Sequence, residues 1–229
     1  MSRGAVILLP LVLLVAPVTG GDEPQAFREV SFATADGGRV FANLYDRGDR
    51  AVVLAHGAVF DKESWQPFAQ VLADNGLTVL AIDFRGYGKS VAGSQTKALK
   101  EDILAAIRYL REAGSQTVSV LGASMGGTAA ARAAMETAPG EIDRLILLAP
   151  APLEKAGLLE ATHILFVVSK GERLRPAVEQ SFAKAPDPKR LEILEGDSHA
   201  QHIFKTEQGA RLTQILLADL TDRPDPEQP

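Results

Sequence analysis

The sequence has no cysteine among its 229 residues, and this absence excludes several kinds of site at once. Without a thiol, the chain cannot form disulfide bonds, bind a metal through thiolates, use a cysteine nucleophile or carry a lipid on an N-terminal cysteine. The chain also lacks a cluster of Lys and Arg, and its formal net charge is -5. Because nucleic-acid phosphates are bound by clustered cations, we expect no nucleic-acid partner.

The chain also lacks an apolar run that favours a membrane span. A helix that crosses a bilayer needs about 20 apolar residues, whereas the N-terminal run Ala5–Val18 is shorter and is interrupted by two prolines. Arg3 precedes this run, and the small residues Val18-Thr19-Gly20 close it, as is typical of a signal peptide. We expect cleavage near Gly20, a secreted or periplasmic protein, and no stable membrane insertion after cleavage; a retained membrane anchor is the alternative.

The remaining length suits one globular domain. Hydrophobic residues make up 46% of the sequence, which is ordinary for a protein with a sizeable core. We therefore predict a signal peptide over residues 1–20, a linker over 21–26, a single domain over 27–221 and a disordered acidic tail over 222–229.

Within this domain, apolar strand-like runs alternate with segments of helical spacing. Strand-like residues on both sides of Asp36-Gly37-Gly38 predict an antiparallel hairpin at a sheet edge, formed by Glu29–Ala33 and Arg39–Tyr45. Buried strands are predicted at Ala51–Ala55, Leu77–Ile82, Val118–Gly122, Leu145–Leu148, Ile164–Val168 and Leu191–Leu194. Helices are predicted from a Ser64 cap to Gly76, over Leu99–Leu110 with a stop at Gly114, over Met125–Met135 and over Leu212–Leu220. This alternation predicts an α/β fold with a mostly parallel sheet, helices on both faces and functional groups at the carboxyl ends of the strands.

One strand is followed by a turn that can present a nucleophile. Ser124 lies between Gly122 and Gly126, after a β-branched apolar run and before an alanine-rich helix. A serine on such a tight strand-to-helix turn has strained backbone angles and needs neighbours without bulk. The pattern G-x-S-x-G therefore predicts a nucleophile elbow at Ser124, although a plain glycine-rich turn also satisfies it.

A serine nucleophile needs a base, and the sequence offers only four histidines. In nucleophile-elbow enzymes the order along the chain is serine, acid, histidine, so only His199 and His202 come late enough. His199 follows the last predicted strand through a turn that contains Gly196. We therefore predict that His199 is the base and that His202 is its neighbour.

The acid is expected after the predicted strand Ile164–Val168. The loop that follows contains Glu172, whose carboxylate can hold the imidazole in one tautomer and stabilise its charged form. Glu154, after the preceding strand, is the reserve candidate, and Asp197 is too near His199 along the chain to face it. A solvated loop charge is the alternative for Glu172.

Together these residues resemble the α/β-hydrolase superfamily, in its serine-nucleophile, lidless, esterase-like branch. The resemblance is carried by His56-Gly57, Asp83–Ser90 (D-x-R-G-x-G-x-S), the G-x-S-x-G of Ser124 and Gly196-x-x-His199, all in family order. Branches with a nucleophilic carboxylate are disfavoured by Ser124, and the dienelactone hydrolases by the lack of cysteine. The family acid is more often Asp, so Glu172 is a departure.

The resemblance implies roles for further residues. The backbone amides of Ala58 and Met125 form the oxyanion hole, each worth roughly 3 kcal/mol of transition-state stabilisation. His56 braces the oxyanion loop, and Arg85 and Tyr87 are scaffold residues. No metal or organic cofactor is required.

The predicted function is an exported serine hydrolase that acts on a small-molecule ester or related acyl compound. Residues 151–162, between two core strands, are too few for a cap domain, so we expect an open pocket. Two rival functions remain: an acyltransferase with the same triad, and a non-catalytic binding protein on a hydrolase scaffold.

Overall fold

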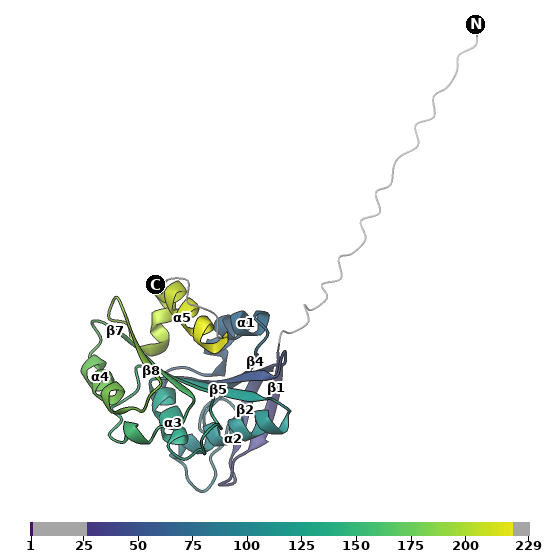
Figure 1. Cartoon of the computed structure of the whole chain (residues 1–229). Helices are drawn as coiled ribbons and strands as arrows, with labels where there is room; N and C mark the ends of the chain where they lie inside the picture. Colours follow the sequence, from purple (N-terminus) through teal and green to yellow (C-terminus); the bar gives the residue numbers. More distant parts are fainter. Residues whose placement is uncertain (2–26, 222–229) are drawn as a thin grey trace.

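The computed structural model of the chain describes Met1 and residues 27–221 (Figure 1). Apart from Met1, the predicted signal peptide (1–20), linker (21–26) and tail (222–229) lie outside the described residues. Within residues 27–221, no helix combines the length and apolar character that a bilayer crossing requires.

A single sheet of eight strands organises the described part of the chain. The strands are β1 (Arg28–Ala33), β2 (Arg39–Tyr45), β3 (Arg50–Ala55), β4 (Thr78–Ile82), β5 (Thr117–Ala123), β6 (Arg144–Leu148), β7 (His163–Ser169) and β8 (Lys189–Leu194). Their order is β1-β2-β4-β3-β5-β6-β7-β8. The β1–β2 hairpin lies at one edge, where β2 pairs antiparallel with β4. The strands β4, β3, β5, β6, β7 and β8 are mutually parallel. The predicted fold class and edge hairpin are confirmed.

Helices cover both faces of this sheet, as Figure 1 shows with α1 and α5 on one face and α2 and α3 on the other. The helices are α1 (Gln66–Asp74), α2 (Leu99–Glu112), α3 (Met125–Ala134), α4 (Arg175–Lys184) and α5 (Gly209–Thr221), with short 3₁₀ turns η1 (Lys62–Trp65), η2 (Ala156–Leu158) and η3 (Ala200–Lys205). The central strands β3 and β4 are buried almost throughout, because helices exclude water from both of their faces.

The order of the central strands creates a crevice at one place. From β3 the chain crosses through α1 to β4 on one side, whereas from β5 it crosses through α3 to β6 on the other. The loops after β3 and β5 therefore diverge, and ligands of open α/β sheets bind at such switch points. Because Ala55 of β3 pairs with Gly122 of β5, the loops that begin at His56 and Ser124 leave the sheet side by side.

Two local predictions need correction, and one helix has no counterpart among the predictions. Ser64 does not cap a helix: Asp61 accepts the Ser64 N–H and begins the turn η1, and α1 starts only at Gln66. Helix α4 was not predicted, because only Val178 and Ser181 of its residues are buried and no apolar stripe marks it. Strand β8 begins at Lys189, two residues before the predicted start.

No cap domain interrupts the described sheet. The connection between β6 and β7, residues 149–162, contains only the turn η2. The carboxyl ends of the central strands are therefore not covered by an inserted domain, as predicted.

Candidate active site

Ser124 lies directly after β5 on a strained turn. Its φ of 53° and ψ of −112° are unfavourable for a residue with a side chain. A Cβ added at Gly122 would lie 2.4 Å from the carbonyl oxygen of Gly126, and one added at Gly126 would lie 2.3 Å from that of Ala55. Both glycines of the motif are therefore required by close backbone packing, and the turn they permit presents Ser124 at the crevice.

His199 and Glu172 form a hydrogen-bonded chain with this serine. His199 Nε2 lies 2.7 Å from Ser124 Oγ, and His199 Nδ1 lies 2.8 Å from Glu172 Oε1. An ionised carboxylate only accepts hydrogen bonds, so the neutral imidazole carries its proton on Nδ1 and leaves Nε2 to accept the serine proton. The three residues predicted as nucleophile, base and acid are thus brought together, in the geometry that general-base activation of serine requires.

His199 and Glu172 differ in their contact with solvent. The His199 side chain is 37% exposed, whereas that of Glu172 is 7% exposed. Within the described residues, Glu172 Oε2 is buried and has no hydrogen-bond partner. The side chain of Glu172 therefore forms its hydrogen bond within the described residues to His199, while the imidazole remains accessible to solvent.

The reserve acid lies elsewhere. Glu154 is exposed in the connection between β6 and β7, and Asp197 is exposed in the loop before His199. Neither carboxylate forms a hydrogen bond or ion pair with His199, whose Nδ1 is taken by Glu172.

The loop after β3 orients the backbone N–H of Ala58, which is predicted to bind the oxyanion. The Gly57 carbonyl lies 2.8 Å from His56 Nδ1 and accepts a hydrogen bond from the Phe60 N–H at 3.0 Å. The Ala58 N–H belongs to the same planar peptide group and points away from that carbonyl. Among the described residues, neither the Ala58 nor the Met125 N–H donates a hydrogen bond, so both remain available to an oxyanion.

His56 braces this loop and is poorly suited to proton transfer. Its Nε2 accepts the Phe84 N–H at 3.2 Å, so the ring proton must lie on Nδ1, where it is donated to the Gly57 carbonyl. Burial lowers the pKa of His56, which keeps the imidazole neutral. Its ring packs edge-on against Phe84 and Tyr87, with centroids 5.1 and 4.6 Å away.

Tyr87 links the two halves of the predicted oxyanion hole. Its hydroxyl donates to the Ala58 carbonyl at 2.9 Å and lies 3.7 Å from Met125 Sδ. The side chain thereby ties the loop after β3 to the start of α3, which agrees with a scaffold role.

The D-x-R-G-x-G-x-S segment forms a structural brace. Asp83 accepts hydrogen bonds from the backbone N–H and the ammonium of Lys62, at 2.9 and 2.7 Å. Gly88 packs against this carboxylate so closely that a Cβ would lie 2.1 Å from Asp83 Oδ2. Ser90 Oγ donates to the Asp83 carbonyl and accepts the Phe41 N–H, both at 2.8 Å. The motif therefore joins the loop after β4 to η1 and β2.

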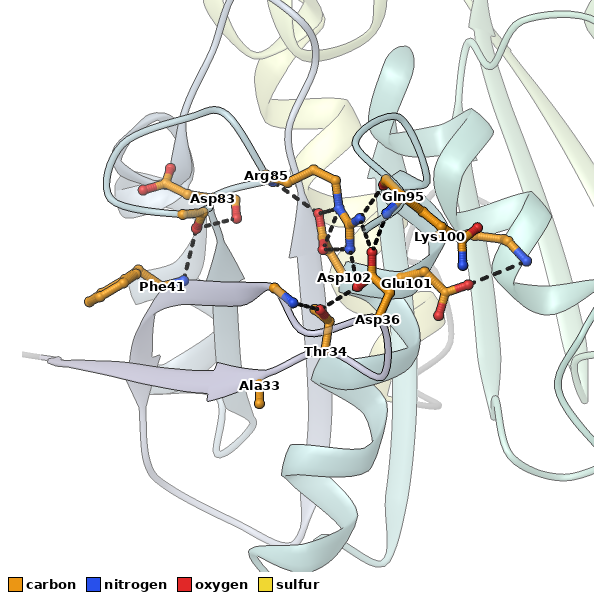
Figure 2. A network of polar contacts seen from close by, with 12 residues as sticks. Ala33, Thr34, Asp36, Phe41, Asp83, Arg85, Gln95, Lys100, Glu101 and Asp102 are labelled. Carbon is orange, nitrogen blue, oxygen red and sulfur yellow. Dashed lines mark hydrogen bonds and ion pairs between the residues drawn. The ribbon is translucent and has the colours of Figure 1, made fainter. Parts of the chain in front are cut away.

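Arg85 lies at the centre of a buried ionic network, which we call the Arg85 cluster and define as Arg85, Asp36, Asp102 and the Gln95 backbone (Figure 2). Arg85 donates to Asp102 on α2 at 2.7 and 2.9 Å and to Asp36 in the β1–β2 turn at 2.8 Å. Hydrogen bonds from Arg85 and Thr34 hold the pKa of Asp36 well below its usual range. All three guanidinium nitrogens are used within the network, so Arg85 is a scaffold residue here.

Gln201 is a site residue that the sequence did not reveal. Its side chain is buried, accepts the Gly57 N–H at 2.7 Å and donates to Ser64 Oγ at 3.0 Å. It thus joins the turn after His199 to the oxyanion loop. Glutamine carries no motif of its own, and only its position two residues after the predicted base could have suggested a role.

A family model supports these observations over most of the described chain. The model described as serine aminopeptidase, S33, matches residues 46–203. The chain belongs to this family and to the α/β-hydrolase superfamily. The matched region begins before β3 and ends within η3, so it includes every residue of the hydrogen-bonded chain and of the predicted oxyanion hole.

The chain also matches individual curated proteins, at modest sequence identity. The chain is 30% identical over 169 residues to the dihydrolipoyllysine-residue acetyltransferase component of the acetoin cleaving system of Cupriavidus necator, a match that covers 74% of this chain and 45% of that protein. In two further curated relatives the match spans 40% and 38% of the relative's length. The chain therefore corresponds to less than half of each of these proteins.

Solved structures share the fold. A predicted CIB-like hydrolase of Thermoplasma acidophilum superposes with a TM-score of 0.71 at 23% identity, over 86% of this chain and 99% of that one. XC6422 of Xanthomonas campestris, described as a serine hydrolase without a lid, gives a TM-score of 0.70 at 17% identity, over 90% of this chain and 99% of that one. At these identities the likeness concerns the fold alone.

Proposed function

We propose that the protein is a serine hydrolase that cleaves an ester or related acyl compound through an acyl-enzyme intermediate. The observation that carries this proposal is the chain Ser124–His199–Glu172, whose two hydrogen bonds of 2.7 and 2.8 Å lie at the switch point of the sheet. The backbone amides of Ala58, in the loop after β3, and of Met125, directly after Ser124, donate no hydrogen bond within the described residues. Membership in a hydrolase family supports the same reaction class.

In the proposed reaction, Ser124 Oγ attacks the substrate carbonyl while His199 Nε2 takes the serine proton. The resulting imidazolium is stabilised by Glu172, and the oxyanion is bound by the amides of Ala58 and Met125. Collapse of the tetrahedral intermediate breaks the bond to the leaving group, which takes the proton from His199. Water, deprotonated by His199, then attacks the acyl-serine, and the carboxylic acid leaves as Ser124 regains its proton. The scheme needs no metal or organic cofactor.

The open site favours small or exposed acyl substrates. The connection between β6 and β7 carries only η2, and the oxyanion loop exposes Val59, whose relative exposure is 79%. A substrate can therefore approach His199 without the opening of an inserted domain.

An acyltransferase with the same residues is the second candidate, because the curated relative from Cupriavidus necator is named an acetyltransferase component. Such an enzyme differs only in the acceptor that attacks the acyl-serine. The product ratio with water alone and with an added alcohol separates the two: alcohol-insensitive formation of the acid favours the hydrolase.

We also propose that the protein is exported, on the strength of the N-terminal sequence alone. Charge at Arg3, the apolar run Ala5–Val18 and the small residues that follow form the pattern of a signal peptide. Mass spectrometry of the mature N-terminus tests this, and retention of residues 1–20 would contradict it.

A fluorophosphonate probe tests the proposed chemistry. We expect the probe to label the wild-type protein and not the Ser124→Ala variant, with both shown to be folded by circular dichroism. Equal labelling of the two, or no labelling of the folded wild type, would contradict the proposal. The latter result is what a binding protein on a hydrolase scaffold predicts.

A further inference from the structure

A cationic groove begins beside the predicted oxyanion hole. It has a volume of about 260 Å³, and its walls are one face of α3 and the start of α2. We call it the α2–α3 groove; its lining residues are Lys97, Ala98, Leu99, Lys100, Met125, Thr128, Ala129 and Arg132.

The groove runs away from the reacting centre along α3. Its four α3 residues, Met125, Thr128, Ala129 and Arg132, occupy positions i, i+3, i+4 and i+7, which places them on one face of the helix. With a rise of about 1.5 Å per residue, Arg132 lies about 10 Å along the axis from Met125. Because Met125 follows Ser124 directly, one end of the groove lies next to the nucleophile.

Two cations of the groove are not neutralised. Lys97 and Arg132 are exposed, and neither side chain forms a hydrogen bond or ion pair with another described residue. Lys100, in contrast, is paired with Glu136 at 2.5 Å and with Glu101 at 3.4 Å. Among the described residues, no carboxylate lines the groove itself, although the whole chain has a formal net charge of -5. The positive charge of Lys97 and Arg132 is therefore not paired with a carboxylate among the described residues, whereas that of Lys100 is.

The α2 wall of the groove is held in place by the Arg85 cluster. Arg85 donates to the Gln95 carbonyl at 2.5 Å, and Asp36 accepts the Gln95 N–H at 3.1 Å. Asp102, four residues beyond Ala98, is fixed by Arg85 on the next turn (Figure 2). The segment that carries Lys97 is thus anchored on both sides, so little ordering entropy would be lost when a ligand binds.

We infer that the α2–α3 groove binds a carboxylate carried by the ester substrate, on its acyl chain or on its leaving group. This inference rests on the proposed function. Lys97 and Arg132 supply the complementary charge, and the apolar residues between them and Met125 accommodate the carbon chain. A neutral ester of the same length leaves both cations without a counter-charge.

Matched substrate pairs test this specificity. For the acyl arm, 4-nitrophenyl hemiesters of dicarboxylic acids with four to eight carbons are compared with the corresponding terminal amides. For the leaving-group arm, 4-acetoxybenzoate is compared with 4-acetoxybenzamide. The readout is the ratio of kcat/KM for the anionic substrate to that for its neutral partner, so that a general loss of activity cancels.

We expect this ratio to exceed one in the wild type in at least one arm and to fall roughly two- to fivefold in Lys97→Gln and in Arg132→Gln. Arg132→Glu should bring it below one. Lys184→Gln, which removes one exposed charge at the end of α4, is the matched control and should leave the ratio unchanged. Added salt should lower the wild-type ratio, because exposed charges are screened.

A wild-type ratio of one in both arms, or a ratio that none of the groove variants alters, would overturn the inference while fluorophosphonate labelling of Ser124 upheld the proposed function. If Ser124 proves unreactive, calorimetric titration of adipate against its diamide needs no turnover. Equal binding of the two, or binding unaffected by Lys97→Gln and Arg132→Gln, would then overturn it.

Discussion

The Arg85 cluster and the Ser124–His199–Glu172 chain are both polar networks at strand ends of one sheet, but they use their hydrogen-bonding groups differently. All three nitrogens of Arg85 donate to partners inside the cluster, and its ionic side chains are at most 3% exposed. In the Ser124–His199–Glu172 chain, the His199 side chain is 37% exposed and Glu172 Oε2 has no hydrogen-bond partner among the described residues. A closed network stabilises the fold, whereas an open one retains groups that can react.

The largest effect on kcat is expected when the predicted nucleophile is removed. Ser124→Ala should lower kcat for ester hydrolysis by about 10⁵-fold or more, because the remaining groups can only bind and polarise the substrate. Steady-state kinetics with a 4-nitrophenyl ester measures this. A variant that keeps more than a hundredth of the wild-type rate would place the reaction elsewhere.

The acid is tested by a pair of matched substitutions. Glu172→Gln keeps the shape of the side chain but loses the charge that orients and stabilises His199, so kcat should fall by about 10⁴-fold. Glu154→Gln, at an exposed position without contact to His199, should change kcat less than twofold. The reverse pattern would assign the acid to Glu154.

The closed network should show its effect in stability. Arg85→Gln leaves Asp102 buried without its counter-charge, and the loss should be about 3–5 kcal/mol in the free energy of unfolding. Urea unfolding followed by circular dichroism gives this value. A loss below about 1 kcal/mol would contradict a structural role for the cluster.

Gln201 connects the histidine turn to the oxyanion loop and should have a smaller effect on rate. Gln201→Leu leaves the Gly57 N–H without its acceptor, which should lower kcat about 10- to 100-fold with little change in KM. Ser64→Ala removes the far partner of Gln201, together with the hydrogen bond from Ser64 Oγ to the Asp61 carbonyl, and is the control, with less than a threefold change expected. Equal effects of the two variants would contradict a positioning role for Gln201.

The smallest effect concerns acid stability. Because the pKa of Asp36 is held below its unfolded value, its contribution to stability is fully present above about pH 4 and is lost as the pH falls through the folded pKa. The difference in unfolding free energy between wild type and Asp36→Asn should therefore be constant near neutrality and shrink below pH 4. A difference that does not change with pH would contradict this account.

The sequence predicts the sheet and the residues of the Ser124–His199–Glu172 chain because both depend on local patterns. Apolar runs locate the parallel strands, and chain order after a G-x-S-x-G turn directs attention to His199 and Glu172. Their catalytic roles remain predictions.

What the sequence could not predict depends on contacts between distant segments or on weak local patterns. Gln201 meets Gly57 across 144 residues, and the α2–α3 groove exists only because two helices lie side by side. The predicted Ser64 cap is wrong because Asp61 caps the turn η1, which precedes α1. Helix α4 could not be predicted from its sequence because few of its side chains are buried and no apolar stripe results.

The central claim is that the open network activates Ser124, and the location of the acyl group tests it most directly. Rapid acid quench of the protein with a slowly deacylating 4-nitrophenyl ester, followed by peptide mapping by mass spectrometry, measures where the acyl group resides. We predict an acylated peptide with the modification on Ser124. An adduct on another residue, or turnover of the ester with no acyl group on the chain at any quench time, would contradict the account.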